Sequence, residues 1–291
     1  MTHILTLIAA RAATTLDNAT IALVSDAVRG TKTDVLSPGE AVDITTADKP
    51  DMVVVRAALA DKPIDAIVTK PRGRRKGLLI ADMDSTIITV ETLDELAVFA
   101  GIGEKIAAIT ARAMNNELNF EEALRERVGM LKGLDVGALE KTFARVELTQ
   151  GARELVGTMR AHNALTALVS GGFTFFTSRV AAMLGFDIHR SNTLLDDGSA
   201  LTGFVAEPIL GREAKLAALN EFATQRGLKL AATLAVGDGA NDLAMLGAAG
   251  LGVAFHAKPV VAAAAQARVN FCDLRALLFA QGYRVGELVT K

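Results

Sequence analysis

The sequence predicts an α/β protein in which a parallel sheet, covered by helices, follows a smaller α/β unit. Short apolar runs of the kind found in strands buried on both faces recur at 77–81, 164–169, 234–236 and 251–254. Helix-compatible stretches separate or follow them at 173–184, 213–225 and 242–248. Alternation of strand and helix patterns predicts a parallel sheet with helices on both faces.

The first 70 residues show a separate alternation. Strand patterns lie at 4–9, 41–46 and 64–69, and helix patterns lie at 18–29 and 51–60. Residues 70–76 then carry five basic residues in seven, with one proline and one glycine, which predicts a solvated linker. We therefore predict a small α/β domain over 1–72 and a larger domain over 77–291.

Residues 82–163 separate the first two strands of the larger domain, which is too long a connection for one crossover helix. The stretch 94–148 is rich in helix-forming residues, and 121–131 is its most regular part. We predict an inserted helical cap over about 94–150 that lies over the functional site. Further along, Asp196-Asp197-Gly198 between short β-like runs predicts a hairpin within 188–204.

Composition narrows the functional class. The 291-residue chain is 51% apolar with a net charge of −2, so it is typical of a folded globular protein. The charge balance offers no footprint for nucleic acid or anionic lipid, and no apolar run approaches the roughly 18–20 residues of a membrane span. The only cysteine, Cys272, cannot form an internal disulfide. These features favour a cytoplasmic protein without nucleic-acid or membrane partners.

Polar motifs follow three of the apolar runs directly. They are Asp82-Met83-Asp84-Ser85-Thr86, Ser170-Gly171-Gly172 and Gly237-Asp238-Gly239-Ala240-Asn241-Asp242. Ligands of parallel α/β sheets bind beyond the carboxyl ends of the strands, so these motifs predict one shared site.

Asp82 and Asp84 are two residues apart and can point into one cleft. A carboxylate at Asp82 could attack phosphorus as a nucleophile, and Asp84 could act as general acid and then general base. Read alone, the pair fits a solvated strand end or a helix cap equally well.

The Asp238 motif supplies oxygen ligands suited to Mg²⁺, and Asp82, the main-chain carbonyl of Asp84 and Asp238 would form a sufficient set. Asn241 and Asp242 could orient ligands or waters behind them. A glycine-rich turn that caps the next helix is the alternative interpretation of this motif.

Two further elements could bind phosphate. Ser170, Gly171 and Gly172 stand at a strand-to-helix junction, where small residues let N–H groups approach an anion. Lys215, near the start of a later helix, could supply a fixed positive charge. In isolation the tripeptide reads as an ordinary turn and the lysine as a surface residue.

Taken together, the order of Asp82-x-Asp84, Ser170-Gly171-Gly172, Lys215 and Gly237-Asp238-Gly239-x-Asn241-Asp242 resembles the haloacid dehalogenase (HAD) superfamily, and more closely its phosphoserine phosphatases. The resemblance covers about residues 77–285. It implies a Rossmann-like core with a helical cap and a Mg²⁺-dependent phosphatase working through an aspartyl phosphate. Its implied substrate is O-phospho-L-serine, hydrolysed to serine and phosphate in the last step of serine biosynthesis.

The same resemblance assigns roles in the cap. It implies that Glu91 holds the substrate ammonium, that Arg127 holds the substrate carboxylate, and that Met114 and Phe120 close over the site. It also places Asn241 among the substrate-binding residues. Without the resemblance, Glu91, Arg127 and Phe120 would read as ordinary helix surface and packing.

Several alternatives stay open. The scaffold could act on another small phosphorylated metabolite, or transfer the phosphoryl group to an alcohol instead of water. A regulator that senses amino acids with a relic core is disfavoured, because no motif residue is missing. Residues 1–72 resemble a degenerate ligand-binding ACT domain, since they lack a clear glycine-containing ligand turn. A homodimer through this unit is one option.

Overall fold

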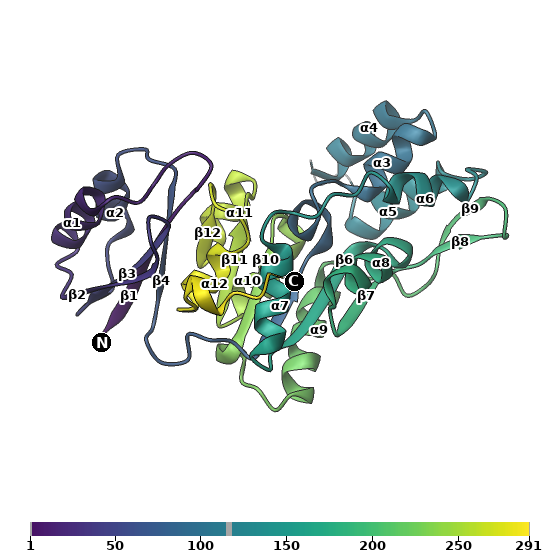
Figure 1. The fold of residues 1–291 in the computed structure, drawn as a ribbon. Helices are drawn as coiled ribbons and strands as arrows, with labels where there is room; N and C mark the ends of the chain where they lie inside the picture. Colours follow the sequence, from purple (N-terminus) through teal and green to yellow (C-terminus); the bar gives the residue numbers. More distant parts are fainter. Residues whose placement is uncertain (1, 115–117, 291) are drawn as a thin grey trace.

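The computed structural model describes residues 2–114 and 118–290; for Ala111, Ala113 and Met114 it describes the backbone alone. Figure 1 shows three parts in a row, with the N-terminal domain at one end, the parallel-sheet core in the middle and the cap at the other end. Among the described residues, none of the helices combines the length and the apolar character that crossing a bilayer requires.

The N-terminal domain is a four-stranded antiparallel sheet of order β2-β3-β1-β4 with two helices on one face. Its elements are β1 (His3–Ala9), α1 (Asn18–Ala27), β2 (Lys32–Ser37), β3 (Ala41–Thr46), α2 (Met52–Leu59) and β4 (Ile64–Thr69). Asp17 and Asp51 cap the two helices through backbone N–H groups. The three predicted strands and two predicted helices are confirmed. Strand β2 was not predicted, because its first half is polar and exposed at the sheet edge.

The second face of this sheet packs on the core. Ile8, Leu36, Ala41 and Ile67 belong to the same apolar cluster as the core residues. Beside them the buried carboxylate of Asp65 accepts three hydrogen bonds from backbone N–H groups. The donors are Asn270 at 2.9 Å, Phe271 at 3.0 Å and Cys272 at 2.9 Å. The two domains therefore share one continuous interior.

The connection between the domains differs from the predicted solvated linker. Arg74 is 12% exposed, and its guanidinium donates to both carboxylate oxygens of Asp43 at 2.6 and 2.9 Å. Arg75 lies 4.1 Å from the centre of the Tyr283 ring and pairs with Glu287 at 2.6 Å. The prediction is wrong for Arg74, because this side chain is bonded to both domains, whereas Arg75 is 44% exposed and pairs with a residue of the core.

The core is a six-stranded parallel sheet of order β12-β11-β10-β5-β6-β7. Its strands are β5 (Leu78–Ala81), β6 (Leu165–Phe173), β7 (Ile188–Asn192), β10 (Thr233–Gly237), β11 (Leu251–Phe255) and β12 (Ala267–Val269). The four predicted strands are its central members. The two edge strands were not predicted, because β7 is polar and β12 has three residues.

Alternate residues of β5 belong to different apolar clusters, one on each face of the sheet. Leu79 and Ala81 pack with α7 (Ala152–Ala161), α8 (Thr174–Leu184) and α12 (Ala276–Ala280). Leu78 and Ile80 pack with α9 (Arg212–Gln225), α10 (Leu243–Ala248) and α11 (Pro259–Ala264). The predicted parallel sheet with helices on both faces is confirmed.

The inserted cap consists of α3 (Thr92–Phe99), α4 (Gly103–Met114), α5 (Phe120–Gly129) and α6 (Gly137–Phe143), which confirms the predicted helical insertion. The predicted hairpin is also present, as β8 (Leu194–Asp196) and β9 (Leu201–Val205). It leaves the core after β7 and is hydrogen-bonded to the cap. Gly133 N–H donates to the Leu201 carbonyl at 2.8 Å, and Val136 N–H donates to the Ser199 carbonyl at 2.9 Å.

Candidate active site

The carboxyl ends of three neighbouring strands bring the sequence motifs together. Strand β5 lies between β10 and β6, so Asp82 after β5 has the Asp238 motif on one side and Ser170 on the other. The backbone N–H of Asp82 donates to the Val236 carbonyl at 3.0 Å, which fixes the strand end beside β10. The structure thus brings the three motifs together at the carboxyl ends of neighbouring strands, as expected from the sequence.

Asp82 is buried and paired with a buried lysine. Lys215 Nζ lies 2.7 Å from Asp82 Oδ1 and 2.7 Å from Asp242 Oδ1. Met83 N–H also donates to Asp82 Oδ1, at 2.8 Å. Burial and the nearby charge of Asp242 raise the pKa of Asp82 despite the lysine. Burial alone would lower the pKa of Lys215, but the two carboxylates outweigh it, so that pKa is raised and the lysine stays cationic.

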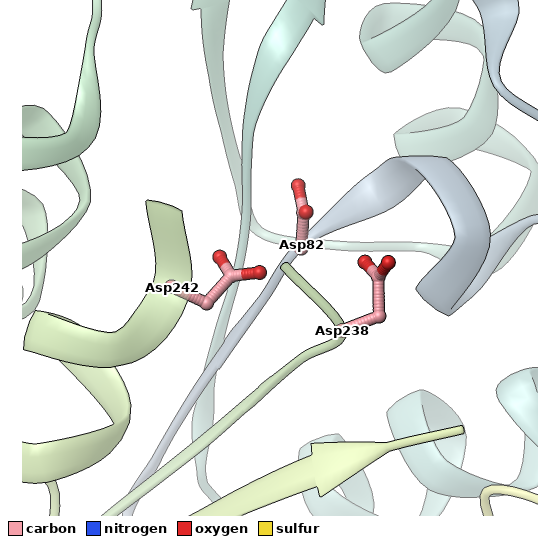
Figure 2. Close-up of side chains that lie close together, drawn as sticks. All are labelled: Asp82, Asp238 and Asp242. Atoms are coloured by element: carbon pink, nitrogen blue, oxygen red, sulfur yellow. The ribbon is translucent and has the colours of Figure 1, made fainter. Parts of the chain in front are cut away.

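Asp238 completes a cluster of carboxylates. Figure 2 shows Asp82, Asp238 and Asp242 side by side, and one oxygen of each lies within 4.8 Å of the others. Burial, then the charges of Asp242 and Glu91, raise the pKa of Asp238 to about 6. Three carboxylates against one ammonium leave an excess of negative charge, which a divalent cation would neutralise. The donor set therefore fits Mg²⁺.

Within this cluster Asp242 is the most fixed side chain. It is fully buried, one of its oxygens accepts from Lys215, and the other accepts from Gly239 N–H at 3.0 Å. A Cβ at Gly237 would lie 2.3 Å from Asp242 Cγ, so glycine is required there. This arrangement suits the predicted position of Asp242 behind the metal ligands.

Asp84 faces the phosphate-binding candidates. Its Oδ1 accepts from Thr92 N–H at 2.9 Å, and its Oδ2 accepts from the Ser170 hydroxyl at 3.2 Å. A Cβ at Gly172 would lie 2.7 Å from Asp84 Oδ2, so the close approach of the two segments depends on that glycine. Burial, together with the charge of Glu91, raises the pKa of Asp84 to about 6. A carboxyl group with this pKa can both donate and accept a proton near neutral pH.

The cap contributes an aromatic contact above the site. Phe120, at the start of α5, packs on two glycines of the core. A Cβ at Gly171 would lie 3.0 Å from its ring, and a Cβ at Gly211 would lie 3.4 Å from it. The predicted place of Phe120 over the phosphate-binding turn agrees with this contact. The side chain of Met114, predicted beside it, lies outside the described part of the structure.

Two charged residues predicted to hold the substrate lie on cap helices. Glu91 immediately precedes α3 and accepts from the Ser85 hydroxyl at 2.6 Å. Arg127 on α5 is half-buried and donates from Nε to the Ala123 carbonyl at 3.2 Å. Burial lowers the pKa of Arg127, and the charges of Asp94 and Glu91 oppose that effect. One anionic and one cationic group therefore lie near each other at the cap.

Sequence reasoning missed several residues that support the site. The Thr86 hydroxyl donates to Asp238 Oδ1 at 3.3 Å, and Ser85 adopts a left-handed backbone with φ 54° beside Glu91. Both belong to the first motif, so their position alone could have indicated a role. The bond from the Thr92 backbone to Asp84 had no sequence signal. Asn241, predicted to bind substrate, packs its amide oxygen against Gly239.

Comparison with known proteins agrees with this geometry. The model of the haloacid dehalogenase-like hydrolases matches residues 79–247. Phosphoserine phosphatase of Haemophilus influenzae is 44% identical over 208 residues, which are 72% of this chain and 66% of that protein. Phosphoserine phosphatase of Streptococcus thermophilus is 44% identical over 68% of this chain and 93% of its own.

A solved structure extends the similarity to the N-terminal domain. The unliganded structure of a probable phosphoserine phosphatase from Vibrio cholerae superposes with a TM-score of 0.81 at 33% identity and covers 98% of this chain and 88% of its own. The chain spans just under two thirds of the Haemophilus relative's length. The matched family model, the similarity to these relatives and the arrangement of the motifs lead to one assignment: the chain belongs to the haloacid dehalogenase-like hydrolases.

Proposed function

We propose that this chain is a Mg²⁺-dependent phosphatase that hydrolyses O-phospho-L-serine to serine and inorganic phosphate through an aspartyl phosphate on Asp82. The observation that carries the proposal is the position of the buried Asp82–Lys215 pair beneath a cap that presents both a carboxylate, Glu91, and a guanidinium, Arg127. The relatives named phosphoserine phosphatase support the same substrate.

The chemistry follows two balanced steps. The Asp82 carboxylate attacks phosphorus, the bond from phosphorus to the serine oxygen breaks, and Asp84 donates its proton to that oxygen. Asp84 then takes a proton from a water molecule, which attacks the aspartyl phosphate and releases inorganic phosphate. Asp82 is thereby restored and Asp84 is protonated again. The bonds from Thr92 and Ser170 hold Asp84 in position for both transfers.

Asp82, the main-chain carbonyl of Asp84 and Asp238 would hold Mg²⁺, with Asp242 behind them. When bound, the ion supplies positive charge that reduces the repulsion between the attacking carboxylate and the phosphate dianion. On the other side of the phosphate, Lys215, Ser170 and the glycines Gly171 and Gly172 would bind its oxygens, with Asn241 nearby.

Selectivity would arise in the cap. Glu91 would pair with the substrate ammonium and Arg127 with its carboxylate, and Phe120 with Met114 would exclude water. A phosphomonoester that lacks one of the two charges would leave the matching side chain without its partner once the substrate covers it, and an unpaired charge shielded from water is costly. The alternative reaction on the same scaffold is transfer of the phosphoryl group to an alcohol instead of water.

Three substrates test this proposal. O-phospho-L-serine carries both charges, phosphoethanolamine lacks the carboxylate, and 3-phosphoglycerate carries a hydroxyl in place of the ammonium. With Mg²⁺ present, kcat/KM for phosphoserine should exceed that of each other substrate by about 10²-fold or more. Equal rates on all three would remove the substrate assignment, and no phosphate release from any would remove the enzymatic one.

Two variants locate the selectivity. Arg127→Met should lower kcat/KM for phosphoserine and leave that for phosphoethanolamine nearly unchanged, because phosphoethanolamine has no carboxylate to lose. Glu91→Gln should show the same contrast between phosphoserine and 3-phosphoglycerate. If either variant affected both of its substrates equally, the role of that residue would be structural.

For residues 1–72 we propose a degenerate ACT-like domain. The order β1-α1-β2-β3-α2-β4 and the four-stranded antiparallel sheet support it. One sheet face is covered by helices and the other packs on the core, which favours a packing role over ligand binding. The homodimer and the cytoplasmic location stay predictions.

A further inference from the structure

One buried amide joins two loops of the site that lie far apart in the sequence. Asn192 is the last residue of β7 and is 2% exposed. Its Nδ2 donates to the Gly171 carbonyl at 2.8 Å, and its Oδ1 accepts from Leu210 N–H at 2.7 Å. Nδ2 also lies 3.4 Å from the Leu210 carbonyl. A single side chain therefore binds the phosphate-binding turn and the loop before α9.

The strand pairing explains why a side chain is needed there. Strands β6 and β7 pair up to Val169 and Arg190 and pair again only at Phe173 and Asn192. Between these points Ser170, Gly171 and Gly172 bulge out of the ladder, which exposes their backbone to a ligand. The Asn192 amide donates to the Gly171 carbonyl within this bulge. It thus holds the turn in place without closing it.

The second loop leads to the catalytic lysine. Leu210 is followed by Gly211, the N-cap residue of α9, and Lys215 lies one turn further along that helix. Since both backbone groups of Leu210 contact the Asn192 amide, the start of α9 is tied to the phosphate-binding turn. A shift of either loop would change where Lys215 stands relative to Ser170.

The cap is seated across the same two loops. The ring of Phe120 packs on Gly171 and Gly211. Gly171 is bonded to Asn192, and Gly211 directly follows Leu210, which is also bonded to Asn192. We call the surface formed by these two glycines the seat of Phe120. The Asn192 amide links the two loops that carry the glycines, and so it sets the distance between them. The described hydrogen bonds of the Asn192 side chain go to Gly171 and Leu210, and none of them goes to the acidic cluster or to the charged cap residues.

We propose that Asn192 is a positioning residue for phosphoryl transfer, which fixes the phosphate-binding turn, the lysine helix and the seat of Phe120 relative to one another. The inference rests on the proposed phosphate chemistry of this site. Displacing the turn by a fraction of an ångström to about 1 Å should lower kcat about 10- to 100-fold in Asn192→Ala. KM for phosphoserine should change much less, because Glu91 and Arg127 are untouched.

The test combines turnover with product inhibition. In Asn192→Ala, inhibition by inorganic phosphate should weaken, whereas inhibition by L-serine should stay nearly unchanged. Thr177→Val is the matched control. Thr177 on α8 is fully buried, and its described side-chain hydrogen bonds go to Ser191 at 2.7 Å and His189 at 3.3 Å, both on β7 with Asn192 and outside the two loops. This variant should lower the melting temperature to a similar extent and leave kcat and phosphate inhibition at wild-type values.

Two outcomes would overturn the inference. One is wild-type kcat and phosphate inhibition in Asn192→Ala, and the other is an equal loss of kcat in Thr177→Val. If the alanine variant does not fold, Asn192→Asp replaces it; it keeps the acceptor for Leu210 N–H, loses the donor to Gly171 and should show the same pattern. Repeating the assay with p-nitrophenyl phosphate separates this inference from the substrate assignment, because the predicted defect concerns phosphate alone.

Discussion

The core contacts a domain on either side, and the two contacts are built differently. Toward the N-terminal domain, two charged groups are buried and fully bonded: Asp65 accepts three backbone N–H bonds, and Arg74 forms a two-pronged pair with Asp43. Toward the cap, ion pairs are exposed, as in Arg179–Glu140, where the side chains are 36% and 62% exposed. Both contacts include apolar side chains of one buried cluster, so the difference between them lies in the charged groups.

This difference separates a fixed joint from a movable one. A buried charge tolerates no displacement of its partners, because each lost bond leaves an unpaired group away from water. An exposed pair loses little when it opens, because water replaces the partner. The N-terminal domain should therefore stay docked through the catalytic cycle, while the cap can part from the core to admit substrate and release serine.

The largest expected effect is on chemistry alone. Asp82→Asn should lower kcat more than about 10³-fold, because the amide cannot form the aspartyl phosphate. The protein should remain folded with its N-terminal domain docked, since no bond of that contact involves Asp82. Phosphate release with Mg²⁺ and a urea unfolding curve together check this prediction. Full activity in Asp82→Asn would end the proposed mechanism.

The next effect is on stability alone. Asp65→Ala should lower the free energy of unfolding by about 3–5 kcal/mol, because three buried N–H groups lose their acceptor. Where the variant remains folded, kcat should match the wild type, as the acidic cluster lies on another part of the core. Asp34→Ala, which removes an exposed pair between the N-terminal domain and Arg284 of the core, should leave the urea midpoint nearly unchanged. Equal midpoints for the two variants would show that burial does not distinguish this contact.

A smaller effect should run in the opposite direction. In metal-free protein at pH 7.5, Asp84→Asn should be more stable than wild type by on the order of 1–3 kcal/mol, because the neutral amide removes a buried charge. The folded-state pKa of Asp84, about 6, lies above its ordinary value of 3.8. In the wild type, the destabilisation caused by the buried Asp84 charge is therefore complete above pH 6, and it decreases as pH falls toward 4.

Urea unfolding in EDTA at pH 7.5 and pH 5 measures this trend. The stability difference between Asp84→Asn and wild type should be smaller at the lower pH. If Asp84→Asn were less stable than wild type at pH 7.5, the ionised Asp84 carboxylate would not destabilise the folded protein, and this explanation would be wrong.

The smallest effect concerns the movable contact. Glu140→Gln removes the pair between α6 of the cap and Arg179 on α8 and should change the free energy of unfolding by less than about 1 kcal/mol. Because the pair joins the cap to the core, KM for phosphoserine should rise slightly and should do so less at high salt. Thermal melting and steady-state kinetics at two salt concentrations test it. A loss as large as that of Asp65→Ala would make the cap as fixed as the N-terminal domain.

The sequence predicted the central sheet and the place where its polar motifs gather, because both depend on local order. Apolar runs mark strands buried on both faces. A polar residue that follows such a run lies at the carboxyl end of a strand, as Asp82, Ser170 and Asp238 do. Edge strands β2 and β7 were missed, because exposure on one side permits polar residues that break the pattern, and β12 was missed because it has three residues.

What the sequence could not predict depends on partners distant in the chain. Arg74 sits in a basic run that reads as solvated, and only the fold places Asp43 against it. Asn192 likewise has no motif of its own. Its role depends on a bulge in β6 and on a loop that returns from the hairpin, and neither can be read from the residues around it.

The hairpin β8–β9 changes what counts as the cap when proteins of this kind are recombined. Because backbone bonds join Gly133 to Leu201 and Val136 to Ser199, the cap is encoded in two separate stretches, about 92–146 and 193–207. A graft of the first stretch alone from a relative would arrive without the strands that complete its edge. Exchange of substrate specificity by cap transfer should therefore require that both stretches move together.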